Sequence, residues 1–196
     1  TPTDMQHILE WLKEKNRYFG SYIYRTLCYL LPVAALILCV ATVFNGAFTK
    51  FLINLFLIQL LIIAINLRFN NHVHAKLGKK LNIFRKYGEL FHYIEKENYK
   101  SELLINIQDN LKSAGGTARD KVNRLSSIIS AFDNRLNLLA GIILNGLFLW
   151  DIQCMLRLEK WKTQNRDKIQ QWFDLLGNYD AMSSLANYAY NNPEFI

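Results

Sequence analysis

Two pairs of side chains stand at spacings that could hold a metal, and each set is incomplete. His72 and His74 flank a single residue, but a zinc site needs three or four ligands and no Cys, Asp or Glu completes the set nearby. Glu89 and His92 have the i, i+3 spacing of di-iron bundles, which require a second such pair and further carboxylates. We therefore predict no metal site in this chain.

The tripeptide Gly78-Lys79-Lys80 resembles the end of a phosphate-binding loop. That motif needs a glycine five residues before the Gly-Lys pair and a Ser or Thr after it, to hold magnesium. Val73 and Lys80 occupy those positions, so nucleotide binding by this loop is not expected. The chain is accordingly predicted to be no enzyme and to hold no cofactor of its own.

The net charge of +7 is concentrated in one part of the chain. Residues 68–100 hold eight basic and three acidic side chains, whereas residues 101–196 hold ten of each. The excess follows the most apolar part of the chain, which favours a membrane surface over a nucleic acid as its partner. Candidate contacts to anionic lipid or phosphate, on a predicted amphipathic helix from His72 to about Asn98, are Lys76, Lys79, Lys80, Arg85 and Lys86. A solvated helix face is the alternative explanation.

Two uncharged runs precede this basic region. Residues 26–49 contain 24 residues without a charge, and 17 more follow Lys50 in residues 51–67. A membrane-spanning helix needs about 20 apolar residues, so the runs predict a helical hairpin that turns at Asn45 and Gly46. Basic residues before and after the runs would place both ends in the cytoplasm. A hairpin buried in the core of a soluble helical domain is the alternative.

An apolar stripe from Thr117 to Lys162 predicts one long helix. Apolar residues recur there in alternating steps of three and four, no proline interrupts them, and Thr117 with Asp120 fits a capping box. At 1.5 Å per residue such a helix is about 65 Å long, which suits a strut or a lever. The residues expected at its buried seam are Ile129, Phe132, Leu136, Leu139, Ile143 and Trp150.

The complete chain is therefore predicted to be all-α, a multihelical bundle with one long lever-like helix and an apolar helical hairpin. Shorter helices are expected over residues 4–19, from residue 101 towards Gly115, and over residues 168–176 and 181–190. We predict two domains, an N-terminal helix with the apolar, membrane-spanning or core hairpin in residues 1–71, and a helical core and lever domain in residues 72–196.

The last third of the chain resembles the MutS family of DNA mismatch repair ATPases. The resemblance is carried by Arg135-Leu-Asn-Leu-Leu, Leu147-Phe-Leu-Trp-Asp, Leu158-Glu-Lys-Trp, Trp172-Phe, and above all Asp180-Ala-Met-Ser-Ser-Leu-Ala-Asn-Tyr-Ala-Tyr-Asn-Asn-Pro-Glu. These residues look like the end of the helical core and lever region. The layout as a whole is similar to that of divergent bacterial MutS-related proteins with an apolar hairpin near the N-terminus.

The resemblance implies a helical scaffold that couples a contacting end to an ATPase domain. It implies that this domain follows residue 196 in the parent protein, with ATP and magnesium bound there, and that the parent is a homodimer acting on double-stranded DNA. The family's Phe-x-Glu mismatch-reading wedge does not occur in this sequence, so mismatch reading is not carried over.

Other classes of function stay open at this stage. A stand-alone, membrane-anchored helical adaptor that binds a protein partner would share the hairpin and the amphipathic helices. A DNA-binding helical module would share the basic charge, and its affinity would fall steeply with salt. The adaptor differs from the ATPase segment in the residues expected after position 196, where the ATPase requires a Gly-rich loop ending in Gly-Lys-Ser or Gly-Lys-Thr.

Overall fold

Helices make up nearly all of the chain, as predicted. The computed structural model describes residues 10–113 and 116–195. Its elements are α2 (Tyr22–Phe44), η1 (Gly46–Phe48), α3 (Thr49–Gly78), α4 (Leu81–Lys96), α5 (Glu102–Leu111), β1 (Lys112–Ser113), β2 (Gly116–Thr117), α6 (Ala118–Asp133), η2 (Asn134–Leu136), α7 (Leu138–Phe148), α8 (Trp150–Asn191) and η3 (Pro193–Phe195). The two short strands pair antiparallel with each other. The predicted all-α class is confirmed.

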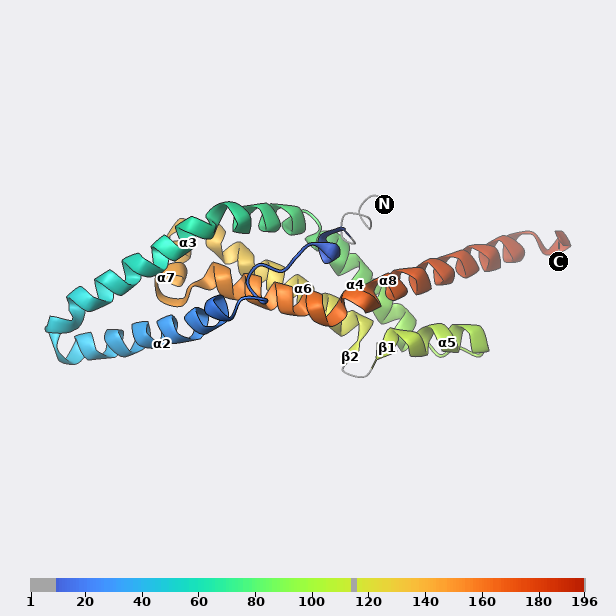
Figure 1. Cartoon of the computed structure of the whole chain (residues 1–196). Helices are drawn as coiled ribbons and strands as arrows, with labels where there is room; N and C mark the ends of the chain where they lie inside the picture. Colours follow the sequence, from blue (N-terminus) through green and yellow to red (C-terminus); the bar gives the residue numbers. More distant parts are fainter. Residues whose placement is uncertain (1–9, 114–115, 196) are drawn as a thin grey trace. The chain divides into compact units, whose positions relative to one another are not determined.

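The apolar runs form two antiparallel helices, α2 and α3, joined by η1 (Figure 1). Asn45 makes the predicted turn: its backbone N–H donates to the Ala41 carbonyl at 2.8 Å, and its side chain accepts from the Ala47 N–H at 3.0 Å. α3 is longer than predicted and runs on to Gly78. The single helix predicted from His72 to about Asn98 is therefore wrong, because residues 79–80 separate α3 from α4.

The long helix predicted from Thr117 to Lys162 is broken into pieces. Its start is as predicted, since the Asp120 N–H donates to Thr117 Oγ1 at 3.2 Å and the Thr117 N–H donates to Asp120 Oδ2 at 3.4 Å. After α6 and η2, however, the chain bends by 110° into α7, and it bends again at Leu149, which has a left-handed φ of 51°. The prediction of an uninterrupted rod over this stretch is wrong.

Local chemistry explains the first break. The Asn137 side chain accepts from the Ala140 N–H at 3.2 Å, which caps α7 and starts a new helix. Gly141 then approaches the Arg135 carbonyl so closely that an added Cβ would lie 2.8 Å from that oxygen. The spacing of apolar residues in steps of three and four indicates neither the Asn137 cap nor the close approach of Gly141.

The predicted seam is consequently only partly buried. Ile129 and Phe132, on α6, are buried as expected. Leu136 lies directly before the bend, Leu139 and Ile143 lie after it, and the three are 71%, 72% and 53% exposed, so their assignment to a buried seam is wrong. Half-buried Trp150 donates its indole N–H to the Ala131 carbonyl at 3.0 Å.

The longest helix is α8, which has 42 residues. It continues through Gly177 and so joins the two short helices expected over residues 168–176 and 181–190. A single glycine inside a helix costs only about 1 kcal/mol, which the rest of α8 can absorb. Towards the N-terminus, residues 10–13 are helical and residues 14–21 are not, so the helix expected to reach Phe19 ends early; its first residues lie outside the described part.

Two compact units divide the chain, and each combines separate stretches. The first contains residues 1–81 and 125–163, and the second contains residues 82–124 and 164–196. The predicted domains instead had a single boundary, after residue 71. The first unit has a core that includes Trp11, Tyr18, Phe132, Ile152, Met155 and Leu158. The second has a core that includes Phe84, Phe91, Leu111, Val122, Ile169 and Trp172.

Candidate functional site

The hairpin of α2 and α3 has an apolar outer surface. Both helices are long and apolar enough to cross a membrane, and only 17% and 11% of their most apolar windows are buried in the structure. Side chains such as Ile37, Val43 and Phe44 are mostly exposed. A continuous exposed apolar surface of this extent marks a contact with a membrane or with another protein, whereas single scattered apolar residues have no such meaning.

Two amide side chains of α3, Gln59 and Asn66, are buried and make hydrogen bonds, whereas Asn54 of the same helix is exposed. Gln59 donates to the Leu31 carbonyl at 3.3 Å, and Asn66 accepts from the Tyr24 hydroxyl at 3.2 Å. Gln59 and Asn66 are both fully buried. A helix pair in a membrane requires this arrangement, since polar groups facing lipid would lack partners.

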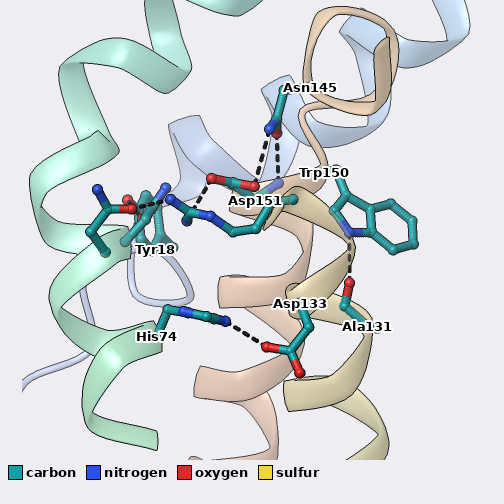
Figure 2. Close-up of polar contacts among 10 residues, drawn as sticks. Tyr18, His74, Ala131, Asp133, Asn145, Trp150 and Asp151 are labelled. Carbon is teal, nitrogen blue, oxygen red and sulfur yellow. Dashed lines mark hydrogen bonds and ion pairs between the residues drawn. The ribbon is translucent and has the colours of Figure 1, made fainter. Parts of the chain in front are cut away.

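A buried ion pair lies beside the hairpin in the first unit (Figure 2). Arg135 Nη1 lies 2.8 Å from Asp151 Oδ2, and a second guanidinium nitrogen donates to Asn71 of α3. Asn145 of α7 completes the Asp151 environment: its amide donates to Asp151 Oδ1 at 3.1 Å, and its oxygen accepts from the Asp151 N–H at 2.9 Å. This set of four residues is called the Arg135 cluster below.

Burial and the neighbouring polar groups have opposite effects on the pKa of Asp151 in the Arg135 cluster. Asp151 is 1% exposed, and burial raises the pKa of its carboxyl, while Arg135 and the Asn145 hydrogen bond act to lower that pKa. A buried carboxylate without such partners would be strongly destabilising. The cluster therefore holds the start of α8 against η2.

His74 of α3 makes a separate contact to Asp133 at the end of α6 (Figure 2). Its Nε2 lies 2.7 Å from Asp133 Oδ1, and its ring packs edge-on against Phe132 at 5.1 Å. The Arg135 guanidinium also lies over the Phe132 ring, with its carbon 5.0 Å from the ring centre. His74, which could have been a metal ligand by spacing, thus has an acidic hydrogen-bond partner.

Glu159 of α8 holds the extended stretch before α2. Its carboxylate accepts the backbone N–H groups of Arg17, Tyr18 and Phe19 at 2.8, 2.8 and 2.7 Å. Nearby, Lys162 donates to the Glu14 carbonyl at 2.8 Å. Three bonds to one carboxylate replace the helical bonds that these amides would otherwise make, which explains why the predicted first helix ends early.

The predicted basic contact residues fall on two helices and the turn between them. Lys76, in the last turn of α3, pairs with Glu14 at 2.6 Å, and Lys79 and Lys80 occupy the break before α4. Arg85 and Lys86 are exposed on α4, in the second unit. Their contact with lipid or phosphate stays a prediction.

Among the described residues, no group of three or more His, Cys, Asp or Glu is placed to hold a metal ion. Outside the hairpin, burial raises the pKa of the Cys154 thiol to about 12, so this cysteine is a poor nucleophile.

The second unit contains a shallow groove between α5 and α8. It has a volume of about 380 Å³ and is lined by Leu103, Asn106, Ile107, Asn110, Leu175, Asn178, Ala181 and Met182. Beside it, the Tyr99 hydroxyl donates to the Tyr179 hydroxyl at 3.2 Å. The groove is largely apolar and suits a side chain of a protein partner better than a charged ligand.

Sequence reasoning missed Arg135, Asp151, Asn145 and Glu159. A usable signal was present for the first two, because Arg135 and Asp151 flank the longest uncharged stretch of the C-terminal half, residues 136–150. Glu159 gave no such signal, since its partners are backbone groups about 140 residues earlier.

Comparisons with known proteins add no further constraint. No family model, curated protein or solved structure matches this chain.

Proposed function

We propose that this chain is the helical core and lever segment of a MutS-like ATPase, anchored in a membrane by the α2–α3 hairpin. In this proposal the chain performs no catalysis itself. It connects the membrane anchor to an ATPase domain in the parent protein, which would bind ATP and magnesium. Double-stranded DNA and a second copy of the parent are further partners that the resemblance implies.

The observation that carries the proposal is the continuity of α8. Its first turns include Asp151 and Glu159, which bind the elements around the hairpin, and its last turns contain residues 180–191, where the MutS resemblance is strongest. A helix without a break transmits displacement along its axis, because its backbone hydrogen bonds resist stretching. The lever is thus proposed for α8, in place of the broken stretch predicted from the sequence.

Exposed apolar side chains near the end of α8 offer a contact surface for the proposed ATPase domain. Leu185, Tyr188 and Tyr190 are 68%, 59% and 85% exposed, and all three fall within the stretch that resembles MutS. Large apolar groups at such density are usually covered in a complete protein. We assign this surface to the ATPase domain of the same parent.

The family assignment is tested by the coding sequence beyond residue 196. The proposal expects a strand followed by a Gly-rich loop that ends in Gly-Lys-Ser or Gly-Lys-Thr. An open reading frame that closes soon after Ile196 would reject the ATPase segment. DNA binding has its own test: affinity of the full chain for a duplex should fall steeply with salt, and no binding at low salt would remove DNA as a partner.

The anchor is tested by flotation of the full chain with lipid vesicles. The parent chain should float, and the double variant Leu30→Arg, Ile37→Arg should float less, because a charge near the centre of a spanning helix costs about 3 kcal/mol. Leu30 and Ile37 are exposed in the structure, so the substitutions leave the packed core intact. Leu185→Arg, at an exposed leucine of α8, is the matched control and should float like the parent chain.

A second candidate function is a membrane-anchored adaptor, and the groove between α5 and α8 favours it. Leu103, at the rim of that groove, is 57% exposed and could receive a partner's apolar side chain. An adaptor would keep a partner through this groove without any ATPase domain. Loss of a partner on Leu103→Asp, with a reading frame that ends near residue 196, would favour the adaptor over the ATPase segment.

A further inference from the structure

We infer that residues 136–150, which include α7, form a re-entrant loop whose exposed apolar face contacts the acyl chains of the membrane that holds the hairpin. This inference rests on the proposed membrane anchor and adds a third lipid-facing element to it. We assign lipid as the partner of this apolar face. The test below distinguishes lipid from a protein that covers the same face.

The composition of this loop is that of a membrane element. Residues 136–150 contain no charged side chain. Exposed apolar side chains line one part of it: Leu136, Leu138, Leu139, Ile142 and Ile143. Such a cluster is costly in water at about 25 cal/mol per Å² of apolar surface, and contact with acyl chains removes that cost.

Contacts with the hairpin place α7 at membrane depth. α7 packs against both α2 and α3, and Figure 1 shows it beside α3. Its Gly146 meets the Phe56 ring so closely that an added Cβ would clash with the ring. Phe56 is about 10 Å along α3 from Thr49, at the turn of the hairpin. In a hydrocarbon core about 30 Å thick, a spanning hairpin therefore holds Gly146 inside the apolar layer.

Backbone groups at both ends of α7 have hydrogen-bond partners within the protein. Irregular backbone at membrane depth is tolerated only where its polar groups have partners within the protein. At the start of α7, Asn137 bonds the Ala140 N–H through its side chain and the Gly141 N–H through its carbonyl, the latter at 2.7 Å. At the end, the Phe148 carbonyl accepts from the Gln153 side chain at 2.7 Å, and the Leu149 N–H donates to the Asn145 carbonyl at 3.1 Å.

The two charges that bound the loop neutralise each other. Arg135 precedes the uncharged stretch, Asp151 follows it, and their side chains form the buried 2.8 Å ion pair of the Arg135 cluster. Neither charge then needs water at the point where the loop leaves the aqueous side. A soluble loop would have no need to bury these two residues against each other, because both could be solvated at the surface.

The test uses fluorescent labels on single cysteines of the full chain in lipid vesicles. The background is Cys39→Ala, because Cys28 and Cys154 are buried and will not react in the folded protein. Labels are placed at Leu139 on α7, at Val40 on α2 and at Tyr188 on α8, three positions that are all more than half exposed. Quenching is measured with doxyl-labelled lipid from within the membrane and with iodide from water. Ile143→Cys repeats the α7 measurement in case one substitution disturbs the fold.

Labels at Leu139, Ile143 and Val40 should lose fluorescence to doxyl lipid and be protected from iodide, while the Tyr188 label should behave oppositely. Iodide quenching of both α7 labels, with the Val40 label still quenched by lipid, would overturn the re-entrant loop and leave the anchor intact. Protection of the α7 labels from both quenchers would also overturn it, in favour of protein coverage. Iodide quenching at Val40 as well would reject the anchor itself.

Discussion

At the scale of single residues, the first unit is held together by buried charged side chains that form an ion pair or bind backbone N–H groups. Glu159 accepts three amide protons, and Asp151 is satisfied by Arg135 and Asn145. A buried ion pair adds little stability over an apolar pair of similar size, but removing one partner leaves an uncompensated charge. These residues therefore fix which conformation the chain adopts more than they add to its stability.

Replacing one member of the Arg135–Asp151 pair should be more damaging than replacing both. Asp151→Asn leaves the Arg135 guanidinium buried without a carboxylate, and we expect a loss of about 3 kcal/mol in the free energy of unfolding. The double variant Arg135→Met, Asp151→Asn should recover most of that loss. Denaturant unfolding in detergent micelles, followed by tryptophan fluorescence, measures both.

Lys76→Met is the control for this prediction. It removes an ion pair with Glu14 whose side chains are 26% and 43% exposed, and water screens such pairs. We expect a change of less than about 1 kcal/mol. A double variant as unstable as Asp151→Asn alone would contradict the assignment of Arg135 as the unpaired charge.

Glu95 in the second unit should make stability depend on pH. Burial raises the pKa of its carboxyl above the ordinary value of 4.5, although the Arg119 N–H, at 3.2 Å, acts in the opposite direction. The folded state then binds the proton more tightly than the unfolded chain, so the ionised form is penalised above the folded-state pKa. Glu95→Gln, which mimics the protonated form, should be more stable than the parent at pH 7.

The difference between the two proteins should shrink as the pH falls through the folded-state pKa of Glu95, and vanish below pH 4.5. Comparing unfolding midpoints of parent and variant at several pH values isolates Glu95 from the other carboxylates. A difference that stays constant across this range would show that the carboxyl does not titrate as its burial indicates.

At the scale of elements, the sequence predicted helix content far better than helix limits. The apolar runs and Asn45 located the hairpin correctly, because length without charge and a turn residue are both local signals. The stripe through residues 117–162 failed because α7 is apolar on nearly all sides, so its spacing looks the same whether the chain runs straight or bends. The bend is set by Asn137 and by the close approach of Gly141 to Arg135, which are contacts in space.

The candidate site was predictable only in part, for the same reason. The apolar hairpin could be predicted from composition, because a helix long and apolar enough to cross a membrane needs only a long uncharged stretch. The Arg135 cluster could not, because it joins α3, α7, α8 and the end of η2 across more than 60 residues of sequence. Likewise, α8 continues through Gly177, although the sequence predicted two separate helices over residues 168–176 and 181–190.

Two glycines in different helices should respond oppositely to alanine. Gly146→Ala places a methyl group against the Phe56 ring, and we expect a loss of about 1 to 3 kcal/mol in unfolding free energy. Gly177→Ala, with nothing within 4 Å of the added Cβ, should gain about 1 kcal/mol from helix propensity. Thermal melts in detergent micelles compare the two.

A second substitution shows whether the Phe56 contact is the cause. Phe56→Leu shortens the side chain that the Gly146→Ala methyl group would strike, so the double variant should melt closer to the parent than Gly146→Ala does. Strictly additive losses from the two changes would mean that α7 and α3 do not meet there.

At the scale of the whole molecule, the proposal assigns different surroundings to different stretches of one chain. The hairpin and α7 are assigned to lipid, while α8 after residue 164 and the helices of the second unit are assigned to water or to a partner domain. The balance of charge agrees with this division, since the stretches assigned to lipid interior are almost free of charge and residues 101–196 otherwise carry ten basic and ten acidic groups.

This division predicts the sidedness of the hairpin in intact cells. If α2 and α3 both cross the membrane, a cysteine replacing Ala47 in the turn lies outside the cytoplasm, and one replacing Lys79 after α3 lies inside it. Both side chains are exposed in the structure, so a membrane-impermeant maleimide can reach either one from its own side. In a Cys39→Ala background, the Ala47→Cys protein should react in intact cells and the Lys79→Cys protein only after permeabilisation. Reaction of neither protein until the cells are opened would mean that the hairpin enters the membrane without crossing it, or stays in the cytoplasm, and flotation with vesicles separates those two cases.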